Sequence, residues 1–169
     1  KKNFAAEWRG YPESIKKEIL TDFAIDFTYN TNAIEGSTLT LEDTAEVIRH
    51  KMSPNKPLAD VQETVNHAKT FFSVFNEKKE MTSSLMLQWH SGVFKETKHD
   101  IAGKWREYLV RVGSYLAPDW QDLPQLIKEL FTFYGKNKDA MHAVELAARM
   151  HYKFEKIHPF GDGNGRAGR

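Results

Sequence analysis

The sequence contains no cysteine among its 169 residues. Neither a disulfide framework nor a cysteine-rich zinc site can therefore form, and we expect a reducing, cytoplasmic setting. No apolar run approaches the length of a membrane span and no signal peptide is evident, so we expect no membrane contact. Neither sign of charge dominates, since the formal net charge is +1, and no long-range field attracts nucleic acid.

No internal repeat or low-complexity segment occurs, and the length suits one domain with a full core. Most of the chain has helical periodicity, so the predicted fold class is mainly α. Residues 1–10 read as an irregular lead-in, and residues 140–156, apolar almost all round, read as the central helix. We expect an N-terminal helical region over residues 1–80 and a core over residues 81–169.

The closing stretch, His158 to Arg169, is rich in groups that handle phosphate. The glycines in 163–165 allow turn conformations that direct successive backbone N–H groups at one anion. Arg166 and Arg169 are three residues apart, so on a helix they share one face. Two guanidinium groups on one face suit the oxygens of a di- or triphosphate.

Two further residues of this stretch favour chemistry at the phosphates. Asp162 directly precedes the glycines, and a carboxylate beside phosphates usually recruits Mg²⁺. His158 can accept a proton near neutral pH, as a general base on an attacking hydroxyl must. Residues 163–168 also match the G-x-G-x-x-G dinucleotide pattern, but a helix rather than a strand is predicted before them, so we reject that interpretation.

At these residues the chain resembles the Fic family, whose motif is H-P-F-x-[D/E]-G-N-G-R-x-x-R, and every defined position matches from His158 to Arg169. Fic enzymes mostly transfer AMP from ATP onto a Ser, Thr or Tyr hydroxyl of a target protein. The resemblance implies a Fic-fold helical bundle with a short β-hairpin flap. The related Doc toxin, a kinase, has Lys where this chain has Gly165, which favours AMP transfer over phosphate transfer.

The resemblance also implies a role for each motif residue. His158 would deprotonate the target hydroxyl, Asp162 would hold Mg²⁺ on the α- and β-phosphates, and Phe160 would anchor the loop in the core. Arg166 would bind the β-phosphate and Arg169 the γ-phosphate. The implied nucleotide-binding residues are Gly161, Asp162, Gly163, Asn164, Gly165, Arg166 and Arg169.

A second stretch, residues 31–36, resembles the Fic inhibitory motif [S/T]-x-x-x-E-[G/N], with Thr31, Glu35 and Gly36 at the defined positions. Within the family the glutamate pairs with the second motif arginine, so the implied pair is Glu35 with Arg169. A carboxylate there would take the partner of the γ-phosphate and misplace the α-phosphate for in-line attack. The alternative is an ordinary helix end, with Gly36 as its cap and Glu35 in solvent.

Residues 101–115 are rich in β-forming side chains and resemble the Fic flap, a hairpin that docks the main chain of the target. The alternative is an ordinary hairpin on a helical domain. The implied target-docking residues are Gly103, Lys104, Trp105 and Arg106.

Smaller signals concern single residues. Thr40 and Asp43 have the spacing of a capping box, which predicts a helix start. His90 is interpreted as a hydrogen-bonded core histidine rather than a ligand. His151, Glu155 and His158 lack the H-E-x-x-H spacing, so we predict no metal site from them.

The leading hypothesis is therefore a protein adenylyltransferase that uses ATP and Mg²⁺, modifies a hydroxyl-bearing protein and is inhibited by Glu35. One alternative is an enzyme that removes AMP, with Glu35 positioning water; another is a nucleotide-binding interaction domain without catalysis. A homodimer is one expectation for its assembly, with no nucleic acid bound. The sequence starts without Met and stops at Arg169, where a helix should continue, so we expect C-terminal truncation.

Overall fold

A computed structural model describes residues 2–169, and Lys1 lies outside the described residues. Contacts divide the chain into two compact units, one ending at Phe72 and the other running from Ser73 to Arg169. The division falls within helix α4 (Leu58–Asn76), a few residues before the position near 80 expected from the sequence.

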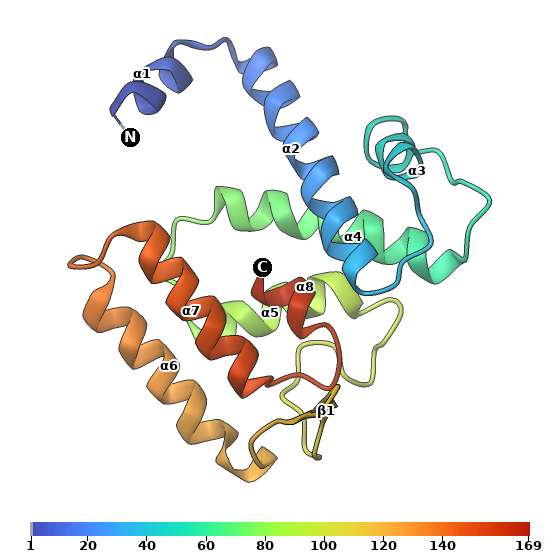
Figure 1. Ribbon diagram of the computed structural model, residues 1–169. Coiled ribbons are helices and arrows are strands. Elements are labelled where there is room, and N and C mark those ends of the chain that lie inside the picture. Colours follow the sequence, from blue (N-terminus) through green and yellow to red (C-terminus); the bar gives the residue numbers. More distant parts are fainter. Residues whose placement is uncertain (1) are drawn as a thin grey trace. The chain divides into compact units, whose positions relative to one another are not determined.

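The first unit is helical throughout its regular structure (Figure 1, blue to green). Besides the first part of α4 it contains α1 (Lys2–Gly10), α2 (Glu13–Ile34), α3 (Leu41–Ala45) and the π-helical turn η1 (Glu46–His50). The expectation of an irregular lead-in was wrong, since all described residues up to Gly10 are helical. The capping box is confirmed: Thr40 accepts from the Asp43 N–H, and the Asp43 carboxylate accepts from the Thr40 N–H.

Polar contacts join α2 to α4 within the first unit. The Thr28 hydroxyl lies 3.0 Å from Nδ1 of His67, and the Asn32 amide donates to the Thr64 hydroxyl at 3.3 Å. All four side chains are buried. Because buried polar groups are costly unless hydrogen-bonded, these pairs fix the rotation of the C-terminal half of α2.

The second unit holds a small antiparallel sheet among helices (Figure 1, green to red). Its elements are the end of α4, α5 (Ser83–Phe94), β1 (Arg111–Val112), β2 (Tyr115–Leu116), the 3₁₀ turn η2 (Trp120–Asp122), α6 (Leu123–Asn137), α7 (Ala143–Ile157) and α8 (Asn164–Gly168). Arg111 pairs with Leu116 and Val112 with Tyr115. The predicted mainly α class with a short hairpin is confirmed, although the hairpin strands occupy only the C-terminal part of the flap expected over residues 101–115.

The core of the second unit forms where α6 packs against α7. Helix α7 buries one face only, so the central position expected for a helix that is apolar almost all round holds for that face and not for the other. Val144 and Tyr152, on its other face, are 70% and 64% exposed. Its buried residues are Leu146, Met150, Phe154 and Ile157. These recur at helical spacing, so α7 is an ordinary amphipathic helix that leads directly into the motif.

No helix among residues 2–169 combines the length and the apolar character that a membrane span requires.

Candidate active site

The motif begins with the loop that joins α7 to α8 and continues through α8, and His158 is its first residue. His158 caps the C-terminus of α7 with φ 49 and ψ 61, a left-handed conformation that is uncommon outside glycine. Its N–H bonds to the Phe154 carbonyl at 2.9 Å, and Nδ1 lies 3.7 Å from a carboxylate oxygen of Glu155. Backbone strain of this kind often marks a functional residue, because the surrounding structure must hold it.

Phe160 fixes the loop to the core, as the sequence predicted. Its ring is fully buried and stacks on His90 at a centroid distance of 3.8 Å and on Trp105 at 4.9 Å. A ring held on both sides cannot move without opening the core, so the residues that flank it are held by this anchor.

His90, buried in α5, ties the loop to the start of the expected flap. The Gly103 N–H donates to Nδ1 at 2.9 Å, and Nε2 lies 2.9 Å from the Asp162 carbonyl oxygen. Since Nδ1 accepts, Nε2 must carry the proton and donate to Asp162. Burial lowers the pKa of His90 from 6.5 to about 4, against the opposing effect of Asp162, so the ring is neutral. The prediction of a hydrogen-bonded core histidine is confirmed.

Asn164 closes the loop on itself. Its side-chain oxygen accepts from the Phe160 N–H at 2.8 Å, and its amide donates to the Phe160 carbonyl at 2.8 Å. The side chain is 2% exposed. Both ends of the amide are therefore used within the loop, and only the backbone of Asn164 could contribute to the predicted anion site.

Gly163 must be glycine for two separate reasons. Its φ of 75 is strained for a residue with a Cβ, and a Cβ there would lie 2.2 Å from a ring carbon of Phe94. The backbone of the motif thus lies directly on the Phe94 ring at the end of α5. Gly163 is also the N-cap of α8, whose first turn leaves N–H groups without helical acceptors, as an anion site needs.

Asp162 lies between two cations. Its Oδ2 atom accepts from the Lys98 ammonium at 2.6 Å, and its Oδ1 atom lies 3.5 Å from the Arg166 guanidinium and accepts from the Gly163 N–H at 2.6 Å. Burial alone would raise the pKa of Asp162, but the Lys98 ammonium, Arg166 and the Gly163 N–H together hold it below its usual value. The carboxylate is therefore ionised and half-exposed.

A divalent cation fits this site only with ligands from outside the protein. No cluster of three or more His, Asp or Glu side chains within residues 2–169 could hold a metal ion. Asp162 is a single ionised carboxylate beside a glycine-rich turn. Mg²⁺ commonly binds through one or two carboxylates together with water and substrate phosphates, so this donor set suits Mg²⁺ carried by a nucleotide.

Arg106 holds the start of the motif loop through hydrogen bonds to backbone carbonyls. Its guanidinium donates to the carbonyls of His158, Tyr108 and Pro118 at 2.7–2.8 Å and to that of Ile157 at 3.4 Å. The side chain is 3% exposed. The target-docking role expected for Arg106 stays a prediction, but its contacts are those of an internal brace.

The neighbouring residues of the expected docking segment are also engaged. Gly103 packs so closely on α5 that a Cβ would lie 2.9 Å from Cβ of Ser91. Lys104 donates to the Asp100 carbonyl at 2.9 Å, and Trp105 stacks on Phe160. The hairpin β1–β2 that follows is mostly exposed, as are Tyr108 and Leu109 just before it.

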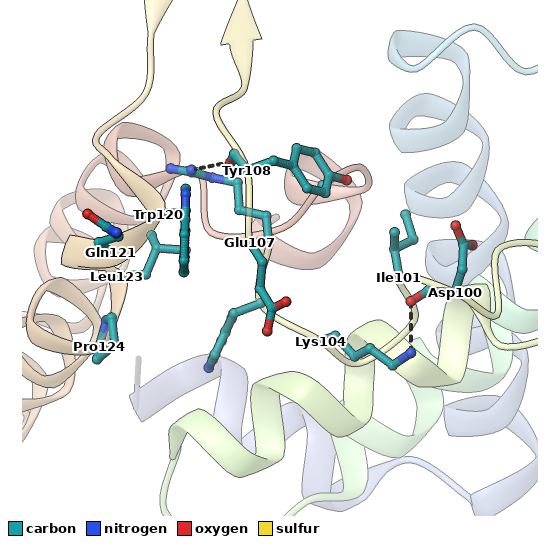
Figure 2. Close-up of a pocket in the computed structure, with 12 residues that line it drawn as sticks. Asp100, Ile101, Lys104, Glu107, Tyr108, Trp120, Gln121, Leu123 and Pro124 are labelled. Atoms are coloured by element: carbon teal, nitrogen blue, oxygen red, sulfur yellow. Dashed lines mark hydrogen bonds between the residues drawn. The ribbon is translucent and has the colours of Figure 1, made fainter.

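A cleft of about 560 Å³ opens beside the motif, and Gly161 forms part of its wall. Figure 2 shows Trp120, Gln121 and Pro124 on one side of the cleft and Asp100, Ile101 and Lys104 on the other. The Tyr108 hydroxyl lies against Gly161, so closely that a Cβ at position 161 would be 2.0 Å from it. The cleft therefore connects the motif with the segment leading to the hairpin.

The segment predicted to be inhibitory belongs to the first unit, at the end of α2. Thr31 is 2% exposed, Glu35 is the C-cap residue, and Gly36 has a φ of 90 that ends the helix. The Glu35 N–H bonds to the Asn32 carbonyl at 3.0 Å. The expected helix end is thus present, and the pairing of Glu35 with Arg169 stays a prediction.

Sequence reasoning missed several residues at this site. Lys98 lies outside the motif, and no local pattern connects it with Asp162. Tyr108 was not singled out among the β-forming residues of the expected flap. Its position two residues after Arg106 could have suggested that it also contacts the motif loop.

A mainly helical unit in which a complete H-P-F-x-D-G-N-G-R-x-x-R loop joins two helices, with a hairpin earlier in the unit, has the architecture of a Fic domain. The chain belongs to the Fic/DOC family, whose model matches residues 80–169.

Several proteins with similar sequences are named protein adenylyltransferase Fic. The protein of that name from Nematostella vectensis is 31% identical over 159 residues, which cover 90% of this chain and 37% of that protein. The one from Drosophila ananassae is 31% identical over 146 residues, which cover 83% of this chain and 29% of that protein. The chain thus spans about a third of the length of these relatives.

Solved structures share the fold over nearly the whole chain. A Fic domain containing signaling protein from Bacteroides thetaiotaomicron matches with a TM-score of 0.81 and 26% identity, covering 99% of this chain and 68% of that one. A Fic family protein from Desulfovibrio desulfuricans matches with a TM-score of 0.79 and 26% identity, covering 98% of this chain and 54% of that one.

Proposed function

We propose that this chain is the catalytic domain of a protein adenylyltransferase that moves AMP from ATP to a Ser, Thr or Tyr hydroxyl of another protein. The observation that carries the proposal is the intact motif loop, in which the strained His158 and the ionised Asp162 are held by three separate supports. The supports are His90, Asn164 and Arg106. The names of the relatives agree with this reaction.

His158 would act as the general base. It takes the proton of the target hydroxyl while that oxygen forms a bond to the α-phosphorus of ATP. The bond between the α-phosphorus and the oxygen that bridges to the β-phosphate breaks, and pyrophosphate leaves. The left-handed backbone of His158 and the hydrogen bond from Arg106 to its carbonyl fix the backbone position from which the imidazole projects. A pre-organised general base requires such a fixed position.

The rest of the motif would hold the triphosphate. The turn at Gly163 and the first turn of α8 offer backbone N–H groups, while Arg166 and Arg169 offer guanidinium groups to the β- and γ-phosphates. Asp162 would hold Mg²⁺, which neutralises phosphate charge as the pyrophosphate leaves. Gly165, where the related kinase has lysine, favours AMP transfer.

The target would dock at the hairpin and the adjoining cleft. β1 and β2 are two residues each, mostly exposed and free to pair with an extended segment along one edge. The cleft next to Gly161 lies beside the motif and would receive a side chain near the modified hydroxyl (Figure 2). Lys104 and Trp105 line this cleft, and in this proposal they contact the docked target there.

Glu35 would regulate the reaction by pairing with Arg169 and so removing the partner of the γ-phosphate. Support comes from the segment itself: Thr31, Glu35 and Gly36 match the inhibitory motif. The hydrogen bond from Asn32 to Thr64 joins this helix end to α4 within its own unit. A regulatory carboxylate needs such a rigid base, because a mobile one would lose entropy on pairing.

The test is incubation of the protein with labelled ATP, Mg²⁺ and a cell lysate, with the added mass read by mass spectrometry. We expect an added AMP, a higher yield for Glu35→Gly, and a loss of about 10²–10⁴-fold for His158→Ala. Equal labelling by all three proteins would refute the proposal. Release of AMP from a modified target, lost in Glu35→Gly, would indicate the opposite reaction, and nucleotide binding without turnover a non-catalytic domain.

A further inference from the structure

Lys98 places a second cation on the motif carboxylate from outside the motif. It lies between α5 and the segment that leads to the hairpin, and its ammonium is 2.6 Å from Oδ2 of Asp162. The same ammonium lies 5.2 Å from the centre of the Phe94 ring, and the Arg166 guanidinium lies 4.4 Å from it. Asp162 and Phe94 therefore hold two cations together at one end of α5.

The two oxygens of Asp162 are not equivalent. Oδ1 accepts from the N–H of Gly163 at 2.6 Å and lies 3.5 Å from Arg166. Rotating the carboxylate would break the bond to Gly163, whose backbone is wedged against Phe94. Oδ2 is therefore the oxygen left for an incoming cation, and Lys98 already binds it.

An ammonium group and a divalent cation on one carboxylate oxygen repel each other, so each weakens the binding of the other. Both partners of the pair are partly exposed, at 34% for Lys98 and 44% for Asp162. The lysine side chain can thus leave into solvent without opening the core, since ion pairs at such sites are weak.

We propose that Lys98 is an internal competitor for the divalent cation: its ammonium on Oδ2 of Asp162 weakens metal binding at that oxygen, and a bound metal in turn weakens the Lys98–Asp162 pair. The assignment of this metal to catalysis rests on the proposed function, whereas the competition is a property of the two side chains alone. Because of this competition, half-saturation of Asp162 needs a higher metal concentration than it would without Lys98. Cations that bind weakly are therefore excluded.

The direct test uses Mn²⁺ alone, with free Mn²⁺ measured by electron paramagnetic resonance as it is titrated into the protein. Lys98→Met keeps an unbranched side chain of similar length but removes the charge. We expect this variant to bind Mn²⁺ about 1.5–5-fold more tightly than the parent, the range set by removing a partly exposed ion pair. Lys95→Met, which removes an exposed charge at the end of α5, should leave the affinity near that of the parent.

A second variant separates a local effect from a general change of charge. In Asp162→Asn, the additional Lys98→Met substitution should no longer tighten Mn²⁺ binding. Equal affinity of the parent and Lys98→Met, or the same gain in the Asp162→Asn background, would overturn the proposal.

ADP binding by calorimetry at a series of Mg²⁺ concentrations extends the test to the nucleotide. We expect Lys98→Met to need less Mg²⁺ for the same ADP affinity and to bind ADP like the parent when Mg²⁺ is absent. A loss of ADP affinity without Mg²⁺ would instead make Lys98 a phosphate ligand and contradict competition. Failure of both proteins to bind ADP would count against the proposed function, while the Mn²⁺ result would still decide the role of Lys98.

Discussion

The imidazole of His90 can serve the loop only while it is neutral. Nδ1 accepts from Gly103, and a protonated ring would present a donor to that donor. Burial lowers the pKa of His90 to about 4. In the unfolded chain the ring has its ordinary pKa of about 6.5.

We therefore predict a pH-dependent stability that originates at His90. Between pH 6.5 and about 4 the unfolded state binds the proton and the folded state does not, so unfolding becomes easier as the pH falls. The contribution is fully present above pH 6.5 and is lost by pH 4, at most about 3 kcal/mol. Urea unfolding at several pH values, compared between the parent and His90→Gln, measures it. An identical pH slope in both proteins would contradict the assignment.

Gly163 offers a residue-scale test of the contact between the motif and α5. Gly163→Ala adds a Cβ both at positive φ and inside the Phe94 ring, whereas Gly113→Ala adds one at positive φ with nothing within 4 Å. The control should lose about 1–2 kcal/mol from backbone strain alone. Gly163→Ala should lose about 1–3 kcal/mol more from overlap. Chemical unfolding gives both values, and equal losses would show that Phe94 yields without cost.

At the scale of elements, one side chain joins the segment before β1 to the end of α7. Arg106→Leu would remove the donors to the carbonyls of His158 and Pro118 and leave buried acceptors unmatched. We predict a loss of about 2–4 kcal/mol in unfolding free energy, with a similar loss in Arg106→Lys because one ammonium cannot reach all the carbonyls. Unchanged stability with a raised KM for the target would instead establish the docking role.

The elements differ in how much of them the sequence could predict. The capping box at Thr40 and the proline in the first turn of α6 are local signals, and both helices start accordingly. The one-sided burial of α7 depends on which neighbours cover it. An apolar composition indicates which residues could be buried, but it does not indicate how many faces of the helix are covered by neighbouring elements.

The motif shows the same limit more sharply. Its residues are close in sequence, so a phosphate site formed by His158, Asp162 and the arginines could be predicted from spacing. The role of Asn164 as a clamp on Phe160 is also local, but a hydrogen-bonding side chain in a glycine-rich stretch has too many possible partners to assign. Lys98 could not be found, because its contact depends on how α5 packs against the loop rather than on any sequence pattern.

At the scale of the whole molecule, the predicted inhibitory segment and the motif lie in different units of the chain. If Glu35 acts through its proposed pair with Arg169, the coupling is lost when either side chain is removed. The proposed pair, Glu35 with Arg169, has opposite charges. It can therefore be tested with a substitution that removes the charge and keeps the size of the side chain.

We predict that Glu35→Gln raises the rate of AMP transfer, since the amide keeps the size of the side chain but not the charge that competes with the γ-phosphate. Glu42→Gln, a neighbouring exposed charge removed from the first turn of α3, should leave the rate unchanged. ATP affinity should change less than the rate, because inhibition through the γ-phosphate acts on the geometry of the α-phosphate. Rates and affinities measured for both variants decide this, and equal activation by Glu42→Gln would show that net charge, rather than a specific pair, restrains the enzyme.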